Sequence, residues 1–106
     1  MSKQKASSTE TVDELGPDST GRWLVTTFSG TRHEWDLDRR TYKRIPAADS
    51  RGMGMYTDGV AVPIWQVRAW PRVGASSYVE LDASYSEVVW WLSTTVTKIE
   101  RLPEDD

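Results

Sequence analysis

The chain has 106 residues, among them six tryptophans and no cysteine, and its formal net charge is −3. This length fits one domain, and the lack of cysteine excludes disulfides, thiolate nucleophiles and thiolate metal sites. Because no stretch has the apolar character of a secretory signal or a membrane span, we expect a cytoplasmic protein, located in the host cytoplasm if a phage encodes it.

The first 20 residues contain no aromatic side chain and are interrupted by Gly16-Pro17. Such a polar segment cannot bury enough apolar surface to offset the entropy of ordering it. We therefore expect a disordered leader over residues 1–20, a single β-rich domain over 21–102 and an acidic tail over 103–106.

Residues 22–28 and 31–37 both alternate with a period of two and are rich in β-branched and aromatic residues, which predicts strands. Ser29-Gly30 lies between them, and glycine adopts the positive φ of a tight turn without steric cost. The two segments are predicted to form a hairpin. A third strand is expected over residues 41–45, where Pro46 ends it.

The segment from Pro46 to Gly59 has no periodicity and is the longest internal loop that we expect. Asp58-Gly59 is a strong hairpin signal, which predicts a short pairing of residues 55–57 with 60–62. Pro63 cannot donate a hydrogen bond to a ladder. It is therefore expected to place residues 60–62 at a sheet edge or to separate them from the next strand.

That next strand is predicted over residues 64–70, where alternation places Trp65 and Trp70 on opposite faces. After a turn at Pro71 to Gly74, a further strand is expected over residues 77–81.

The last third of the chain fits two structures. Ser84 and Glu87 have the spacing of a capping box, and the apolar residues that follow lie at helical spacings. The segment is also rich in valine, tryptophan and threonine, which lose rotamer freedom in a helix and suit a pleated sheet. We favour strands with a bend near Ser93 and keep a C-terminal helix over residues 85–102 as the alternative.

Short strands separated by tight turns predict an all-β fold, mainly an antiparallel meander. Such a meander forms a small SH3-like barrel or a curled sheet, and closure of the barrel would protect its edges.

Five runs in the sequence carry a resemblance: Gly21-Arg22-Trp23-Leu24-Val25-Thr26-Thr27, Ser29-Gly30-Thr31-Arg32, Trp35-Asp36-Leu37-Asp38-Arg39-Arg40-Thr41, Arg44-Ile45-Pro46 and Ser93-Thr94-Thr95-Val96-Thr97-Lys98-Ile99-Glu100. In these runs the chain resembles short uncharacterised β-rich proteins of actinobacteria and their phages. The resemblance implies a β-rich fold and a phage or host-accessory context, and it implies no activity.

His33, Glu34, Asp36 and Asp38 form the one cluster in the sequence with metal-ligand chemistry. On a strand His33 faces away from the three acids, and their spacing matches no calcium loop. With one histidine, no cysteine and no Gly-x-Ser-x-Gly elbow, the sequence also offers no nucleophile with its base. We therefore expect neither a metal, a cofactor nor an enzyme.

Trp23, Trp35, Trp65 and one residue of the pair Trp90-Trp91 are expected in the core. Adjacent residues of a strand point to opposite faces, so the other member of the pair is expected to be exposed. Trp70 lies beside two arginines, and an exposed indole with guanidinium groups is typical of a protein anchor. The residues that we expect to bind a protein partner are Arg68, Trp70, Arg72, Trp90, Trp91, Met53 and Met55.

A nucleic-acid interface is the alternative, because residues 22–74 carry nine Lys or Arg and five acids. Its candidate residues are Arg32, Arg39, Arg40, Lys43, Arg44 and Arg51. The sequence pI of about 5.1 disfavours this function, since attraction to phosphate supplies most non-specific affinity. A homodimer across an exposed sheet edge is compatible with either function.

Overall fold

The computed structural model describes residues 10–46, 59–82 and 88–103. The described residues form an all-β fold of eight strands joined by antiparallel pairings into one sheet, in the order β1-β8-β2-β3-β4-β5-β6-β7. The strands are β1 (Thr11–Val12), β2 (Arg22–Thr27), β3 (Arg32–Asp36), β4 (Thr41–Ile45), β5 (Val62–Ala69), β6 (Tyr78–Asp82), β7 (Val88–Leu92) and β8 (Val96–Arg101). In this part of the chain there is no helix with the length and hydrophobicity of a membrane span.

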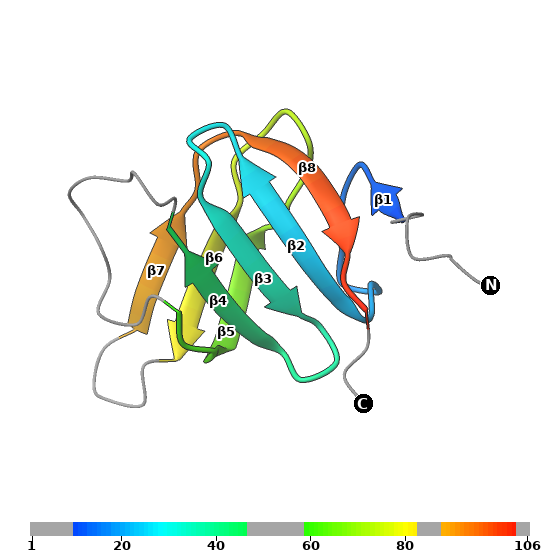
Figure 1. Ribbon diagram of the computed structural model, residues 1–106. Helices are drawn as coiled ribbons and strands as arrows, with labels where there is room; N and C mark the ends of the chain where they lie inside the picture. Colours follow the sequence, from blue (N-terminus) through cyan, green and yellow to red (C-terminus); the bar gives the residue numbers. More distant parts are fainter. Residues whose placement is uncertain (1–9, 47–58, 83–87, 104–106) are drawn as a thin grey trace.

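The sheet curls so that β5, β6 and β7 lie behind β2, β3 and β4 (Figure 1). It does not close into a barrel, because β1 and β7 are its two margins and do not pair with each other. The predicted all-β fold is thus confirmed. Of its two predicted forms, the curled sheet is the one observed, and its edges are not protected by closure.

The predicted hairpin is confirmed: β2 pairs with β3 in a register that places Trp23 opposite Trp35. Gly30 adopts a φ of 90° in the connecting turn, as a residue without a Cβ can. The expected third strand is β4, which continues this row by pairing Tyr42 with Trp35. The alternation places these aromatic side chains on the inner face of the sheet.

The core lies between the two layers of the curled sheet. Val25, Trp35, Val79 and Ile99 are completely buried there, and they come from the strands β2, β3, β6 and β8. Because each strand gives alternate side chains to this core, its other side chains form two outer faces, one on β8-β2-β3-β4 and one on β5-β6-β7.

The last third is a pair of strands, β7 and β8, with an irregular connection at residues 93–95, as the favoured prediction had it. Residues 85–87 of the alternative helix, and both Ser84 and Glu87 of the capping box, lie outside the described residues. Ser93 is buried at the connection, where its hydroxyl accepts a hydrogen bond from the Ser77 N–H and donates one to the Thr94 carbonyl. The chain then enters β8, which lies between β1 and β2.

Pro63 lies inside β5 and pairs with Thr41, so the expectation that it separates two segments is wrong. The Ile64 N–H donates to the Arg40 carbonyl at 2.9 Å. Hydrogen-bonded positions alternate along an antiparallel ladder, so Pro63 occupies a position where β4 requires no donor from it. The residues 55–57 of the predicted hairpin lie outside the described part of the chain.

Residues 10–20 are part of the folded domain, contrary to the expectation of a disordered leader over residues 1–20. Thr11 and Val12 form β1 and pair with β8. Leu15 is only 4% exposed, and its N–H donates to the Pro71 carbonyl at 2.9 Å. This predominantly polar segment therefore contributes Leu15 to the core and packs Val12 against it.

Candidate functional site

The outer face of β5, β6 and β7 carries exposed aromatic side chains. Val79 on β6 is buried, so its neighbours Tyr78 and Glu80 point outward. Trp90 on β7 lies opposite Glu80 in the ladder and is 59% exposed, and Leu92 lies opposite Tyr78 and is 54% exposed. The ring centroids of Tyr78 and Trp90 are 5.9 Å apart.

Trp65 joins this outer face because β5 is irregular. The register between β5 and β6 shifts between Ile64 and Gln66, so two consecutive residues, Trp65 and Gln66, are both exposed while Val67 packs against the core. This is the effect of a β-bulge, which changes the phase of alternation. Trp65 is 58% exposed, which corrects the expectation that it lies in the core.

A second register shift, between Val67 and Ala69, has the opposite effect on Trp70. Arg68 and Ala69 are both exposed, and Trp70 turns inward, with its ring centroid 5.9 Å from that of Trp35. Trp70 is thus a half-buried neighbour of the core, and the expectation that it is the exposed anchor is wrong.

We call Trp65, Tyr78, Trp90 and Leu92 the aromatic face. The ion pair between Arg68 Nε and Glu80 Oε2, at 3.3 Å, lies within the same three strands and carries no net charge. The aromatic face therefore combines apolar side chains with a locally neutralised pair of charges, a composition typical of a protein interface.

The other residues expected to bind a partner are distributed differently. Trp91 faces inward and is half-buried, with the Arg44 guanidinium 4.2 Å from its ring centroid. This arrangement confirms that the adjacent tryptophans occupy opposite faces. Arg72 is exposed beyond the end of β5, in an isolated bridge with Glu14. Met53 and Met55 lie outside the described residues.

The basic residues of the nucleic-acid alternative differ in exposure and position. Arg32 is exposed on β3, and Arg39 and Arg40 lie in the turn before β4. Lys43 is on the outer face of β4, whereas Arg44 is buried on the inner side of that strand. Arg51 lies outside the described residues.

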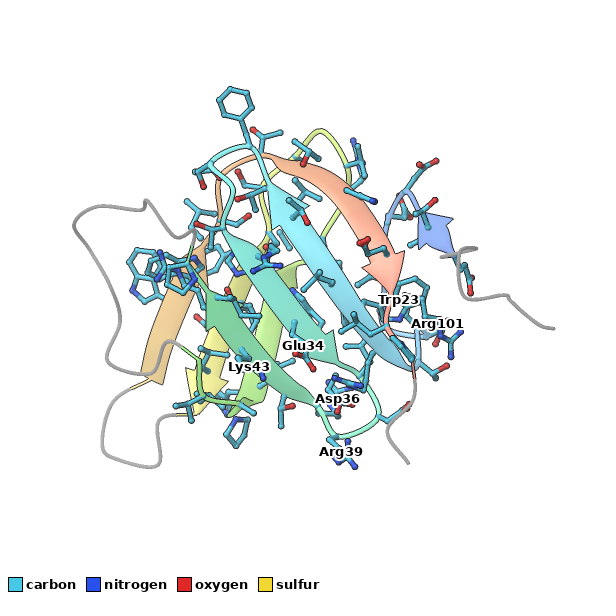
Figure 2. All side chains as sticks on the ribbon, viewed as in Figure 1. Trp23, Glu34, Asp36, Arg39, Lys43 and Arg101 are labelled. Carbon is cyan, nitrogen blue, oxygen red and sulfur yellow. The ribbon has the colours of Figure 1, made fainter. Side chains whose placement is uncertain are left out.

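A charged cleft of about 250 Å³ lies on the outer face of β2, β3 and β4, on the other side of the core from the aromatic face. Figure 2 shows Glu34 and Lys43 on this face and Asp36 and Arg39 at the end of β3. Glu34 pairs with Arg22 at 2.6 Å and with Lys43 at 3.5 Å. Because acids and bases of the cleft pair with one another, the arrangement is that of a structural ion-pair network.

The three acids near His33, for which the sequence predicts no metal site, each have a structural partner. Besides the pairs of Glu34, Asp36 Oδ2 accepts a hydrogen bond from Arg39 Nη1 at 3.0 Å, and Asp38 Oδ1 accepts one from the Gly21 N–H at 3.0 Å. His33 is buried on the opposite side of the strand and hydrogen-bonds the Tyr42 hydroxyl through Nδ1.

Burial and hydrogen bonds shift the pKa of Asp36 in opposite directions. Burial raises it, but the Arg39 N–H, the Arg39 guanidinium and the Asp38 N–H all stabilise the carboxylate. Their combined effect lowers the pKa of Asp36 below its ordinary value of 3.8. The ionised carboxylate thus holds together the turn between β3 and β4.

Three of the four residues of the aromatic face were not among the predicted binding residues, namely Trp65, Tyr78 and Leu92. For Tyr78 a signal existed: within residues 77–81, Val79 and Leu81 mark the inner face and leave Tyr78 outside. No comparable signal existed for Trp65 and Trp70, because strict alternation over residues 64–70 conceals both register shifts.

Comparison with protein-family models, curated proteins and solved structures finds no match for this chain.

Proposed function

We propose that this chain is a non-enzymatic protein-interaction module whose aromatic face binds another protein. The observation that carries the proposal is the exposure of Trp65 and Trp90, at 58% and 59%, on the same outer face of a three-stranded unit. Tryptophan is the residue type most enriched among those that dominate binding energy at protein interfaces.

The free energy of exposure supports the proposal. An indole that is more than half exposed leaves on the order of 100 Å² of largely apolar surface in water, which corresponds to about 2.5 kcal/mol at 25 cal/mol per Å². A partner that covers the two indoles with an apolar surface removes this area from water, which makes binding more favourable. Large exposed apolar patches of this kind typically mark interaction sites.

Rigidity also favours this function. Trp90 lies opposite Glu80 in the ladder, with its ring centroid 5.9 Å from that of Tyr78, and Trp65 is part of β5. Side chains that are already ordered lose less conformational entropy when a partner binds. In the phage or host-accessory context that the sequence resemblance implies, the partner is a host protein or an assembly protein.

The first step of the test is to capture partners from an actinobacterial lysate with the tagged chain, using one nuclease-treated and one untreated half of the lysate. The second step is to measure the affinity of the chain for the protein that is captured and identified. Trp65→Ala and Trp90→Ala are each expected to weaken binding by about 2 kcal/mol, or roughly 30-fold in Kd. Phe28→Ala is the matched control, because Phe28 is an aromatic residue 83% exposed in the β2–β3 turn and is not one of the residues of the aromatic face.

Two results would contradict the proposal. In one, both tryptophan variants bind the partner with the same affinity as the parent chain. In the other, all captured material is lost after nuclease treatment, which would favour the nucleic-acid function instead.

A further inference from the structure

The two margins of the sheet differ in length and in composition. β1 has two residues, whereas β7 has five, and in the described part of the chain β7 pairs with β6 alone. Figure 1 shows β7 at the margin of the rear layer. Natural edge strands are usually protected by lysine, proline, bulges or very short length. β7 consists of valine, tryptophan and leucine and pairs with β6 in a continuous register without a bulge.

The ladder between β6 and β7 fixes which backbone groups of β7 point away from the sheet. The Ser93 N–H donates to the Ser77 carbonyl at 2.9 Å, so these two residues form a hydrogen-bonded pair. Hydrogen-bonded and non-bonded pairs alternate in an antiparallel ladder, and Trp91 and Val89 therefore bond to β6. The N–H and C=O groups of Val88, Trp90 and Leu92 face the open margin.

In one symmetric register, each of these outward-facing backbone groups meets a complementary group of a second copy. When two β7 strands pair antiparallel about a twofold axis at Trp90, Trp90 meets the Trp90 of the second copy, and Val88 meets its Leu92. Every outward-facing N–H and C=O of the strand then has a partner. A twofold axis at Val89 or Trp91 would also join outward-facing groups, but it would leave Leu92 or Val88, respectively, without a partner within the strand. The register centred on Trp90 therefore satisfies the most backbone groups.

We propose that two copies of this chain associate through their β7 edges, with Trp90 at the twofold axis. The electrostatics favour a second copy as the occupant: β7 carries no charged residue, and the nearby Arg68 and Glu80 neutralise each other, so like charges do not oppose one another. The symmetric contact uses the same edge in both copies and closes, whereas pairing of β7 with the two-residue β1 would be short and would leave further edges open.

The dimer would place the two aromatic faces side by side on one continuous sheet. The cross-strand Trp90 pair would lie on the outer face, where aromatic pairs stabilise antiparallel strands. This inference goes beyond the proposed function and does not depend on it, because partner binding needs the outer face of the strands and dimerisation needs the open backbone of β7.

Sedimentation velocity of the full chain from micromolar to sub-millimolar concentration tests the dimer. We expect the mass to rise from 12.0 kDa to twice that value with increasing concentration. Leu92→Pro is expected to remain at the monomer mass, because proline removes an outward N–H while Leu92 makes no ladder bond to β6. Leu92→Ala keeps the N–H and is expected to dimerise.

Trp90→Lys is a second disrupting variant, since it opposes two like charges at the axis without altering the backbone. Trp65→Ala is the matched control: it removes an equally exposed indole of the same face that is not on the edge strand, and it should still dimerise. Far-UV circular dichroism establishes that each variant is folded. The inference is wrong if the parent chain stays monomeric throughout, or if Trp65→Ala abolishes association while Leu92→Pro and Trp90→Lys do not.

Discussion

The guanidinium of Arg44 on β4 lies 4.2 Å from the centroid of the Trp91 ring on β7, inside the curled sheet. A buried cation on one strand thus stacks on an indole of another strand with which it shares no ladder. Such contacts are worth more when they are desolvated than when they are exposed. The contact therefore connects the two layers at a point where β4 and β5 no longer pair.

We expect Trp91→Leu to lower the free energy of unfolding by about 2 kcal/mol, because it removes both the stacking and part of the packing against the core. The neighbouring Trp90 faces outward, and Trp90→Leu should change the stability by no more than about 0.5 kcal/mol. Urea denaturation at low protein concentration measures both values. Equal effects of the two substitutions would contradict the assignment of the tryptophans to opposite faces.

Asp36 should make stability depend on pH in the acidic range. Its pKa is lower in the folded chain than its ordinary value of 3.8, so the unfolded chain binds more protons in the interval between the two values. Its contribution to stability is complete above the ordinary value and is lost as the pH falls through the folded pKa.

The measurement is the unfolding free energy of the parent chain and of Asp36→Asn from neutral pH to below the ordinary pKa. The parent should be more stable at neutral pH, and the difference should shrink on acidification. Asp18→Asn removes an exposed carboxylate and controls for the change in net charge that Asp36→Asn also makes. A constant difference between the parent and Asp36→Asn would contradict this origin of the shift.

Arg40 has a φ of 58° in the turn before β4, a conformation that costs a residue with a Cβ about 1 kcal/mol. Arg40→Gly should relieve this strain and raise stability by up to about 1 kcal/mol, reduced by the greater entropy that glycine has in the unfolded chain. Thermal unfolding tests the change. Arg39→Gly, one residue earlier, should instead destabilise, because it removes the ion pair with Asp36.

Leu15 should contribute to stability as a core residue does. Leu15→Ala is expected to cost about 3 kcal/mol, the usual cost of deleting a buried leucine side chain. The exposed neighbour Glu14 provides the control, and Glu14→Ala should be nearly neutral. A cost of Leu15→Ala below about 0.5 kcal/mol in urea denaturation would show that residues 10–20 do not pack as the structure has them.

The strands that could be predicted from the sequence are those in which alternation is regular and a turn residue marks the end. Residues 22–28 and 31–37 satisfied both conditions, and Gly30 supplied the turn. The strands after residue 87 could be predicted from the preference of valine, tryptophan and threonine for pleated surfaces. In these segments local preference and tertiary structure agree.

The exchange between Trp65 and Trp70 could not be predicted, because a bulge inverts the phase of a strand without a necessary signal in its sequence. One shift leaves Trp65 outside, and a second brings Trp70 to Trp35. Likewise, Leu15 lies in a predominantly polar segment, and its burial brings its backbone to that of the distant Pro71, to which its N–H donates. The candidate site is thus determined by long-range packing, which periodicity does not report.

The position of β8 between β1 and β2 has a consequence for synthesis. β1 to β4 emerge from the ribosome well before β8, and β2 lacks its second neighbour until β8 has been made. Val96 and Ile99, two of the buried core residues, arrive with that strand. Pairing between strands so far apart in the sequence is slow, so we expect the nascent meander to remain incomplete until β8 has left the ribosome.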